Sequence, residues 1–544
     1  MGSIVAARAA GGLILYRLAG LEIEAEMSTT DTLTLPVVTD TGVRVGWRGW
    51  AALIALMLPV LLVSVDNTVL SFALPQISLD LEPTSIQQLW IIDAYPLVLA
   101  GLLVTMGTLG DRFGRRRMLL IGASGFAVVS GLSAFAPTAA FLIAGRAAMG
   151  VFGAMLMPST LSLIRSIFTD RDQRRLAIAV WASMFSAGAA LGPIVGGFLL
   201  EHFAWGSVFL MAVPVLIPLL VLAPLFVPES RDPAPGRIDP LSIVLSLAAM
   251  IPVVYAIKEL AVEGVASAAP LLMVVGVGFG ILFVRRQLRL PTPMLDMRLF
   301  RRGTFTGALL VNLLSVVALV GFLYFVAQHL QLIVGLSPME SGVALVPCLA
   351  IMIAAGLLVV PISARVSPRI VIPTALLFSI AGYLTIAATT GPDSLGSIVL
   401  ASILLGIGIG AAETVSNELI LSSAPPEKAG AASAVSETAY ELGAVLGTAV
   451  LGGILTAIYR TSLVLPTGVS GEVASAARET LAGAMHAAEQ IGGATGAALR
   501  DAAAAAFDAG VGVTSLIGAL LVVAAAIVAA VTLRSSHRAP ALDR

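Results

Sequence analysis

Long apolar runs recur along almost the whole chain, and they constrain its fold more than any other feature. A helix of about 20 residues is long enough to cross the roughly 30 Å hydrocarbon core of a bilayer. Runs of this length fall at 49–76, 86–110, 117–136, 138–164, 176–200, 205–227, 239–259, 268–285, 304–333, 340–363, 369–390, 395–422, 432–459 and 511–533. The sequence therefore predicts an all-α polytopic membrane protein of fourteen spans, with both termini on one side.

The composition agrees with a chain that lies mostly in lipid. Of its 544 residues, 58% are hydrophobic and 12% are charged, and the mean hydropathy is +0.99, far from the values of a soluble domain. A single cysteine, Cys348, excludes an intramolecular disulfide and a cysteine metal cluster, and the four histidines have no ligand spacing. We expect no metal, no cofactor and no nucleic-acid partner.

The distribution of Lys and Arg predicts the orientation, because cytoplasmic loops carry an excess of positive charge. Most of the 31 Lys and Arg lie in loops on the side of the two termini. The opposite side has Lys258 at a span end, and Arg460, Arg478 and Arg500 around one long loop. Both termini are therefore expected in the cytoplasm, beneath the plasma membrane. The Ala- and Gly-rich loop 461–510 would lie outside, as a surface excursion or as a lid.

The span count and a weak internal repeat predict two halves. The stretch Asp111-Arg112-Phe113-Gly114-Arg115 after the second span is echoed by 364–369 after the tenth. Two six-helix bundles with an inserted helix pair would place a binding site at their interface, near the membrane midplane. The predicted parts are a disordered tail 1–47, an amino-terminal bundle 48–230, an inserted pair with linkers 231–302, a carboxy-terminal bundle 303–534, and a tail 535–544. Translation could start at Met1 or at Met27.

Charged side chains inside the predicted spans are candidates for function, because ionised groups are costly in hydrocarbon. Asp66 in the first span, Asp93 in the second and Arg146 in the fourth lie at similar depths at 1.5 Å per residue. A cluster of these three would leave one acid free to bind a proton or a cation. A static buried salt bridge is the alternative.

A second acidic group lies in the other half of the chain. Glu413 and Glu441 are expected deep in their spans, whereas Glu418 and Glu437 are shallower and could be interfacial. Carboxylates in a cavity without a matching Lys or Arg would favour cationic substrates. Aromatic rings that could stack on a flat cation, or simply pack, are Trp90, Tyr95, Trp181, Phe185, Tyr324 and Tyr440.

A short arginine-rich loop joins the second and third spans. It reads Gly-Thr-Leu-Gly-Asp-Arg-Phe-Gly-Arg-Arg-Arg over 107–117. Gly114 permits a tight reversal, and the charges anchor both helix ends to one side of the membrane. The candidate gating residues in this loop are Gly107, Asp111, Arg112, Gly114 and Arg115.

The fifth span carries a run of small residues at helical spacing. Small residues four apart let helices approach closely, and a proline kinks the span. Packing alone could explain the run, whose members are Gly188, Gly192, Pro193, Gly196 and Gly197.

Together these stretches resemble the major facilitator superfamily, and within it the fourteen-span drug:proton antiporters of the quaternary-ammonium type. The resemblance covers roughly 45–535 and rests on the 107–117 loop, the 66–75 stretch, Arg146 and the fifth-span glycines. It implies the major facilitator fold, proton coupling through Asp66 and Arg146, and a conformational switch that involves Asp111. The family's fourth-span pattern Arg-x-x-Gln-Gly-x-Gly has Met149 for Gln and Phe152 for Gly here.

The sequence thus predicts a monomeric, proton-coupled exporter that works by alternating access in the lipid bilayer. Its substrates would be lipophilic, mainly cationic drugs and dyes, such as quaternary ammonium compounds and fluoroquinolones. Asp66 would couple the proton with Arg146 and Asp93, while Asp93, Glu413 and Glu441 would attract cations. The alternative is an exporter of one endogenous metabolite or antibiotic. An enzyme is disfavoured, because no paired His/Asp or Cys nucleophile faces the membrane surface.

Overall fold

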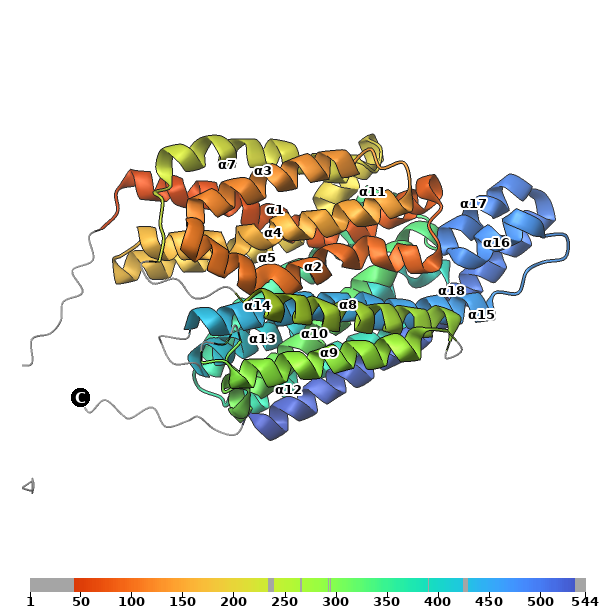
Figure 1. Cartoon of the computed structure of the whole chain (residues 1–544). Helices are drawn as coiled ribbons and strands as arrows, with labels where there is room; N and C mark the ends of the chain where they lie inside the picture. Colours follow the sequence, from red (N-terminus) through yellow and green to blue (C-terminus); the bar gives the residue numbers. More distant parts are fainter. Residues whose placement is uncertain are drawn as a thin grey trace, which may run out of the picture. The chain divides into compact units, whose positions relative to one another are not determined.

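The computed structural model describes residues 44–232, 239–264, 267–291, 293, 295–389, 391–423 and 429–533. These residues form helices joined by short turns, and no strand occurs among them (Figure 1). The predicted tails 1–47 and 535–544 lie outside the described residues, apart from 44–47. The predictions for the tails and for the translation start therefore have no structural counterpart.

The first half of the chain forms a bundle of six spans. Its helices are α1 (Trp47–Leu81), α2 (Ser85–Phe113), α3 (Arg115–Ser133), α4 (Ala139–Ile167), α5 (Arg171–His202), and the short α6 (Ser207–Leu210) followed by α7 (Ala212–Phe226). The helix α1 packs against α5 and α7, and α4 packs against α2 and α3. Thirteen helical stretches among the described residues are long and apolar enough to cross a membrane. The remaining predicted span is α3, whose first turn holds three arginines that lower its hydropathy.

The second half forms another bundle of six spans. Its helices are α10 (Gly303–Leu332), α11 (Pro338–Ser363), α12 (Pro368–Ala387), α13 (Leu395–Ser423), α14 (Ala429–Leu446), the π-helical η4 (Gly447–Gly452), α15 (Gly453–Ser462) and α18 (Gly493–Thr532). The single span predicted at 432–459 is thus a helix interrupted by a π segment. The helix α10 lies against α13, α14 and α18. The last helix begins well before the predicted start of its span at 511.

Two further helices, α8 (Pro240–Glu263) and α9 (Ala269–Arg289), form the inserted pair. They lie side by side as a hairpin (Figure 1). The helix α8 also packs against α2 of the first bundle and against α15 and η4 of the second. The inserted pair therefore touches both halves through α8. This arrangement is the predicted major facilitator fold, two six-helix bundles with an inserted central pair.

The helices run between two ends of the protein, which are called the Gly114 end and the Ser85 end. The Gly114 end holds the turn between α2 and α3, and the Ser85 end holds the start of α2. Gly114 adopts a left-handed φ of +117°, and a Cβ at this position would crowd the carboxylate of Glu229. At the Ser85 end, the Thr84 side chain accepts from the Gln87 backbone, and the Gln87 side chain accepts from the Thr84 backbone. This capping box fixes where α2 begins.

The segment 461–510 is largely helical. It contains α16 (Gly471–Glu479), α17 (Leu481–Ile491) and the first part of α18. The helix α17 packs against α18 and also contacts α1. Ser85 donates to Glu479 from both its backbone N–H (2.8 Å) and its hydroxyl (2.7 Å to the carboxylate). The segment thus ties the second half to the start of α2.

Candidate functional site

A cavity of about 90 Å³ lies at the centre of the protein, where the two bundles meet. Helices α1, α2, α4 and α5 line it from the first half, and α10, α11, α13 and α14 line it from the second. Its polar lining residues are Asn67, Thr68, Ser71, Asp93, Arg146, Glu413 and Tyr440. Pockets for drug-sized molecules measure about 300–1,000 Å³, so the centre is contracted in this structure.

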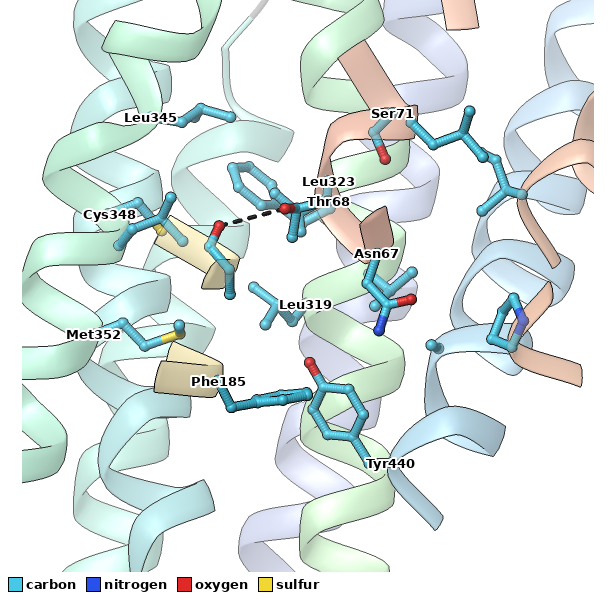
Figure 2. A pocket seen from close by; sticks show the side chains of 18 of the residues that line it. Asn67, Thr68, Ser71, Phe185, Leu319, Leu323, Leu345, Cys348, Met352 and Tyr440 are labelled. Carbon is cyan, nitrogen blue, oxygen red and sulfur yellow. Dashed lines mark hydrogen bonds between the residues drawn. The ribbon is translucent and has the colours of Figure 1, made fainter. Parts of the chain in front are cut away.

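Two aromatic rings from opposite halves meet in the wall of this cavity. Phe185 of α5 and Tyr440 of α14 have ring centres 5.6 Å apart in an edge-to-face arrangement. Figure 2 shows these rings side by side, with the amide of Asn67 close to Tyr440. Ring pairs of this geometry attract one another, and their faces can also stack on a flat cation.

Asp66 and Arg146 form a buried ion pair. Arg146 Nη1 lies 2.6 Å from Asp66 Oδ2, and the side chains are only 2% and 5% exposed. The guanidinium also donates from Nε to the Ile91 carbonyl (3.3 Å) and lies 4.7 Å from the Tyr95 ring centre. Arg146 therefore joins α4 to both α1 and α2. In such a pair, removal of one partner leaves an uncompensated buried charge.

Asp93 has a partner that the sequence analysis did not assign to it. Lys258 Nζ of α8 lies 2.8 Å from Asp93 Oδ2, and both side chains are fully buried. The expectation of one free acid beside Arg146 is therefore wrong, because each of the two carboxylates has its own cation. Lys258 is also not an outside flank residue, since α8 directs it inward against α2. The only sequence signal for the Lys258–Asp93 contact was the position of Lys258 within the apolar run 239–259.

Four carboxylates of α13 and α14 form no ion pair with a described Lys or Arg, namely Glu413, Glu418, Glu437 and Glu441. Glu441 of α14 is only 1% exposed, and Glu413 of α13 lines the central cavity. Glu437 is half-buried and lines a second cavity, whereas Glu418 is exposed. The acidic surplus predicted for this half is therefore present at Glu413, Glu437 and Glu441.

The second cavity, of about 330 Å³, lies toward the Gly114 end. Gly107 and Asp111 of the arginine-rich loop line it, together with Arg165, Trp181 and Glu437. It combines residues of α2, α4 and α5 with residues of α14, so it also lies between the two bundles. More open space is thus present toward the Gly114 end than at the centre.

The charged side chains of the arginine-rich loop bind mainly to the linker after α7. Arg115 pairs with Asp111 at 2.7 Å and donates to the Ser230 hydroxyl at 3.2 Å. The backbone N–H of Arg116 donates to the Glu229 carboxylate at 3.0 Å. Arg112, also a predicted gating residue, is exposed and lies over the Phe113 ring. The loop therefore clamps the end of α2 to the end of α7 within the first half.

The fifth-span glycines serve two different contacts. Side chains at Gly188, Gly192 and Gly196 would collide with Ser64, Thr68 and Val69 of α1, so these three glycines let α5 pack tightly inside the first bundle. The remaining glycine of the run faces the opposite half.

That glycine, Gly197, lies at the Ser85 end of α5. A Cβ there would come within 2.7 Å of Met339 Cα of α11. In the same contact, a side chain at Gly342 of α11 would collide with the Pro193 carbonyl. The backbones of α5 and α11 thus meet directly, and this contact closes the Ser85 end between the two halves.

Comparisons with known proteins agree with this architecture. Residues 56–448 match the family model of the Major Facilitator Superfamily. The chain is 54% identical over 496 residues to the multidrug efflux pump LfrA of Mycolicibacterium smegmatis, covering 91% of this chain and 98% of that protein. It is 36% identical over 467 residues to the methyl viologen resistance protein SmvA of Salmonella typhimurium, covering 85% and 93%.

A solved structure shares the fold. A bacterial homolog of the human lysosomal transporter Spinster, in an inward-facing and occupied conformation, superposes with a TM-score of 0.62 at 18% identity and covers 89% of this chain and 98% of its own. The resemblance stated from the sequence motifs is confirmed by the family match and by the identity to LfrA. The chain therefore belongs to the Major Facilitator Superfamily and is a multi-pass membrane transporter, not an enzyme.

Proposed function

We propose that the protein is a proton-coupled antiporter that exports lipophilic, mainly cationic compounds across the plasma membrane by alternating access. The observation that carries this proposal is the buried Asp66–Arg146 pair beside a central cavity that is also lined by Glu413, a carboxylate without a described cationic partner. The drug-export names of the two relatives support it. Both termini and the Gly114 end would face the cytoplasm, and 461–510 would face outside.

Asp66 is suited to carry the proton because its charge determines whether Arg146 is held. An anionic Asp66 fixes the guanidinium between α1, α2 and α4. A protonated Asp66 attracts that guanidinium far less, so the link from α4 to α1 weakens. Proton uptake and release at one carboxyl group would thereby change the packing of three helices.

Glu413 and Glu441 are suited to attract the substrate. Glu413 lines the central cavity, and Glu441 is buried directly after Tyr440, which also lines it. No described Lys or Arg forms an ion pair with either carboxylate. A carboxylate in a low-dielectric site attracts an organic cation more strongly than one in water does. The Phe185 and Tyr440 rings supply the flat apolar surfaces that lipophilic dyes and drugs need.

Alternating access would use the two ends of the bundle in turn. The Ser85 end is closed by the α5–α11 contact and by the bonds between Ser85 and Glu479. The Gly114 end has the larger interbundle cavity. A substrate would therefore enter the site from the Gly114 end and leave after α5 and α11 separate.

The test is dye efflux from cells that express the protein, with an intact and with a collapsed proton gradient. We expect ethidium and a quaternary ammonium compound to be extruded only when the gradient is present. Efflux that survives collapse of the gradient would contradict proton coupling. Efflux of one compound alone from a broad panel would favour the dedicated exporter of a single metabolite or antibiotic.

A further inference from the structure

Lys258 occupies a complete cation site on the surface of α2. Its ammonium lies 2.8 Å from Asp93 Oδ2, 3.2 Å from the Leu89 carbonyl oxygen, and 3.8 Å from the centre of the Trp90 ring. A carboxylate, a carbonyl oxygen and an indole face are the groups that recognise an organic cation. All three belong to one turn of a single helix, so the site exists without any rearrangement of the fold.

Asp93 faces the ammonium and also belongs to the transport site. The same residue lines the central cavity, together with Asn67 and Glu413. A substrate in an expanded central cavity would therefore reach Asp93 from one side while Lys258 holds it from the other.

The inserted hairpin is attached in a way that permits Lys258 to withdraw. Near the ammonium, α8 contacts the two halves through a small apolar cluster that is separate from the main core, formed by Leu97, Val254, Val445 and Ala449. Lysine is also a point charge on a flexible four-carbon stem, whereas arginine is held by a rigid fork of donors. Tyr255 of α8 lies next to Trp90, with ring centres 6.1 Å apart, and completes the aromatic wall.

We propose that Lys258 is a built-in counter-cation that occupies a substrate cation site at Asp93 and Trp90, and that a cationic substrate binds there by displacing it. The proposal rests on the proposed function, and it assigns the inserted helix pair a direct part in substrate selection. Organic monocations such as quaternary ammonium compounds and phenanthridinium dyes fit this chemistry. A neutral substrate does not compete for Asp93, so Lys258 would not oppose it.

The test measures ethidium binding to the purified full-length protein by fluorescence at pH 7. Lys258→Met removes the competing charge and keeps the length of the side chain. We expect its Kd for ethidium to fall by about tenfold or more, because the site is no longer occupied by the protein's own cation. Lys258→Arg keeps the charge, so we expect no gain in affinity.

Two further variants test whether the increase in ethidium affinity depends on Asp93 and is specific to the charge of Lys258. Lys258→Met combined with Asp93→Asn should lose the increase in ethidium affinity, because the carboxylate that the cation needs is gone. Arg478→Met, at an exposed position of α16, removes a positive charge elsewhere and should leave Kd unchanged. If Lys258→Met does not fold, Lys258→Gln replaces it, since its amide can donate to Asp93.

The outcomes separate this inference from the proposed function. A folded Lys258→Met with unchanged or weaker ethidium binding overturns the role of Lys258, while the proposed export function stands. The same holds if the double variant binds as tightly as Lys258→Met. Absence of ethidium binding in the wild type and in every variant overturns both proposals.

Discussion

The two faces of α2 carry two buried cations in similar surroundings. Arg146 from α4 and Lys258 from α8 each meet a carboxylate, a carbonyl oxygen of α2 and an aromatic ring of α2. The difference lies in the origin of the carboxylate. Asp66 comes from α1, so Arg146 joins three helices of one bundle, whereas Asp93 belongs to α2 itself.

This difference predicts different roles for the two pairs. Separation of Asp66 from Arg146 breaks the ion pair between α1 and α4. A change in the charge of Asp66 therefore alters the packing of the first bundle. Separation of Asp93 from Lys258 leaves that bundle intact and releases only the inserted hairpin. The arginine pair is thus suited to coupling, and the lysine pair is suited to exchange of one cation for another.

The largest effect on transport is expected from a substitution of Asp66, which tests whether the Asp66–Arg146 pair couples the proton. Asp66→Asn cannot cycle a proton, so we expect proton-driven efflux of cationic and neutral substrates alike to be abolished. The measurement is efflux of ethidium and of a neutral substrate from energised cells, with Glu472→Gln on the exposed surface of α16 as control. Full proton-driven transport by Asp66→Asn would place the coupling elsewhere.

The next effect concerns stability. Arg146→Met leaves Asp66 buried without its partner, and loss of one member of a buried pair costs about 3–5 kcal/mol of unfolding free energy. Thermal unfolding in detergent should show a large fall in Tm for Arg146→Met, partly recovered when Asp66→Asn is added. Arg175→Met, at an exposed position, is the control. A Tm equal to that of the wild type would show that the pair does not hold the bundle together.

A smaller and selective effect is expected in the second half. A carboxylate about 10 Å from a bound cation contributes about 1.7 kcal/mol at an effective dielectric constant of about 20, or roughly tenfold in Kd. Glu413→Gln and Glu441→Gln should therefore weaken cation binding about tenfold and leave neutral substrates nearly unchanged. Exposed Glu418→Gln is the matched control. Equal losses for both substrate types would indicate a structural role for these carboxylates.

The arginine-rich loop should affect turnover more than binding. Asp111 accepts from Arg115 beside the Gly114 turn, and Asp111→Asn weakens this clamp without touching the central site. We expect efflux to slow several-fold while the Kd for ethidium stays close to that of the wild type. Asp172→Asn, in the exposed first turn of α5, controls for charge. Unchanged efflux at normal expression would reduce the loop to a topological anchor.

The smallest effect is expected at the Gly114 end of the inserted hairpin. Hydrogen bonds from Arg286, together with those from Ser242, lower the pKa of Asp239 from 3.8 to about 2. A carboxyl group with a lowered pKa stabilises the fold above its unfolded pKa and loses that contribution as the pH falls from about 4 to about 2. Wild type and Asp239→Asn should therefore differ slightly in Tm at pH 5–7 and converge toward pH 2. A difference that persists at pH 2 would contradict this assignment.

Much of the fold was predictable because each span is determined by its own run of apolar residues. The fourteen spans and the inserted pair follow from local hydropathy, and only α3 falls short of it because of its arginines. The π segment at Gly447–Gly452 and the early start of α18 at Gly493 were not predictable. Neither of them changes the apolar pattern from which the spans were counted.

Contacts in the site were predictable from the sequence only where equal depth in the membrane was enough to bring two side chains together. Counting residues along α1 and α4 placed Asp66 and Arg146 at one level, and the structure joins them. The same count could not show that α8 packs against α2. A residue count along a helix gives the depth of a side chain in the membrane, but it does not show which helices are neighbours. Lys258 was therefore assigned to a flank, although it lies against Asp93.

The contact of Gly197 and Gly342 with the backbone of the opposite half has a consequence for the conditions under which the transporter can work. Van der Waals attraction between uncharged main-chain atoms depends little on ionic strength or acidity. A contact of this kind therefore has nearly the same strength at high salt, at low salt and at low pH. The main-chain contact between α5 and α11 is therefore insensitive to salt and acidity, so opening it depends on changes at the central site.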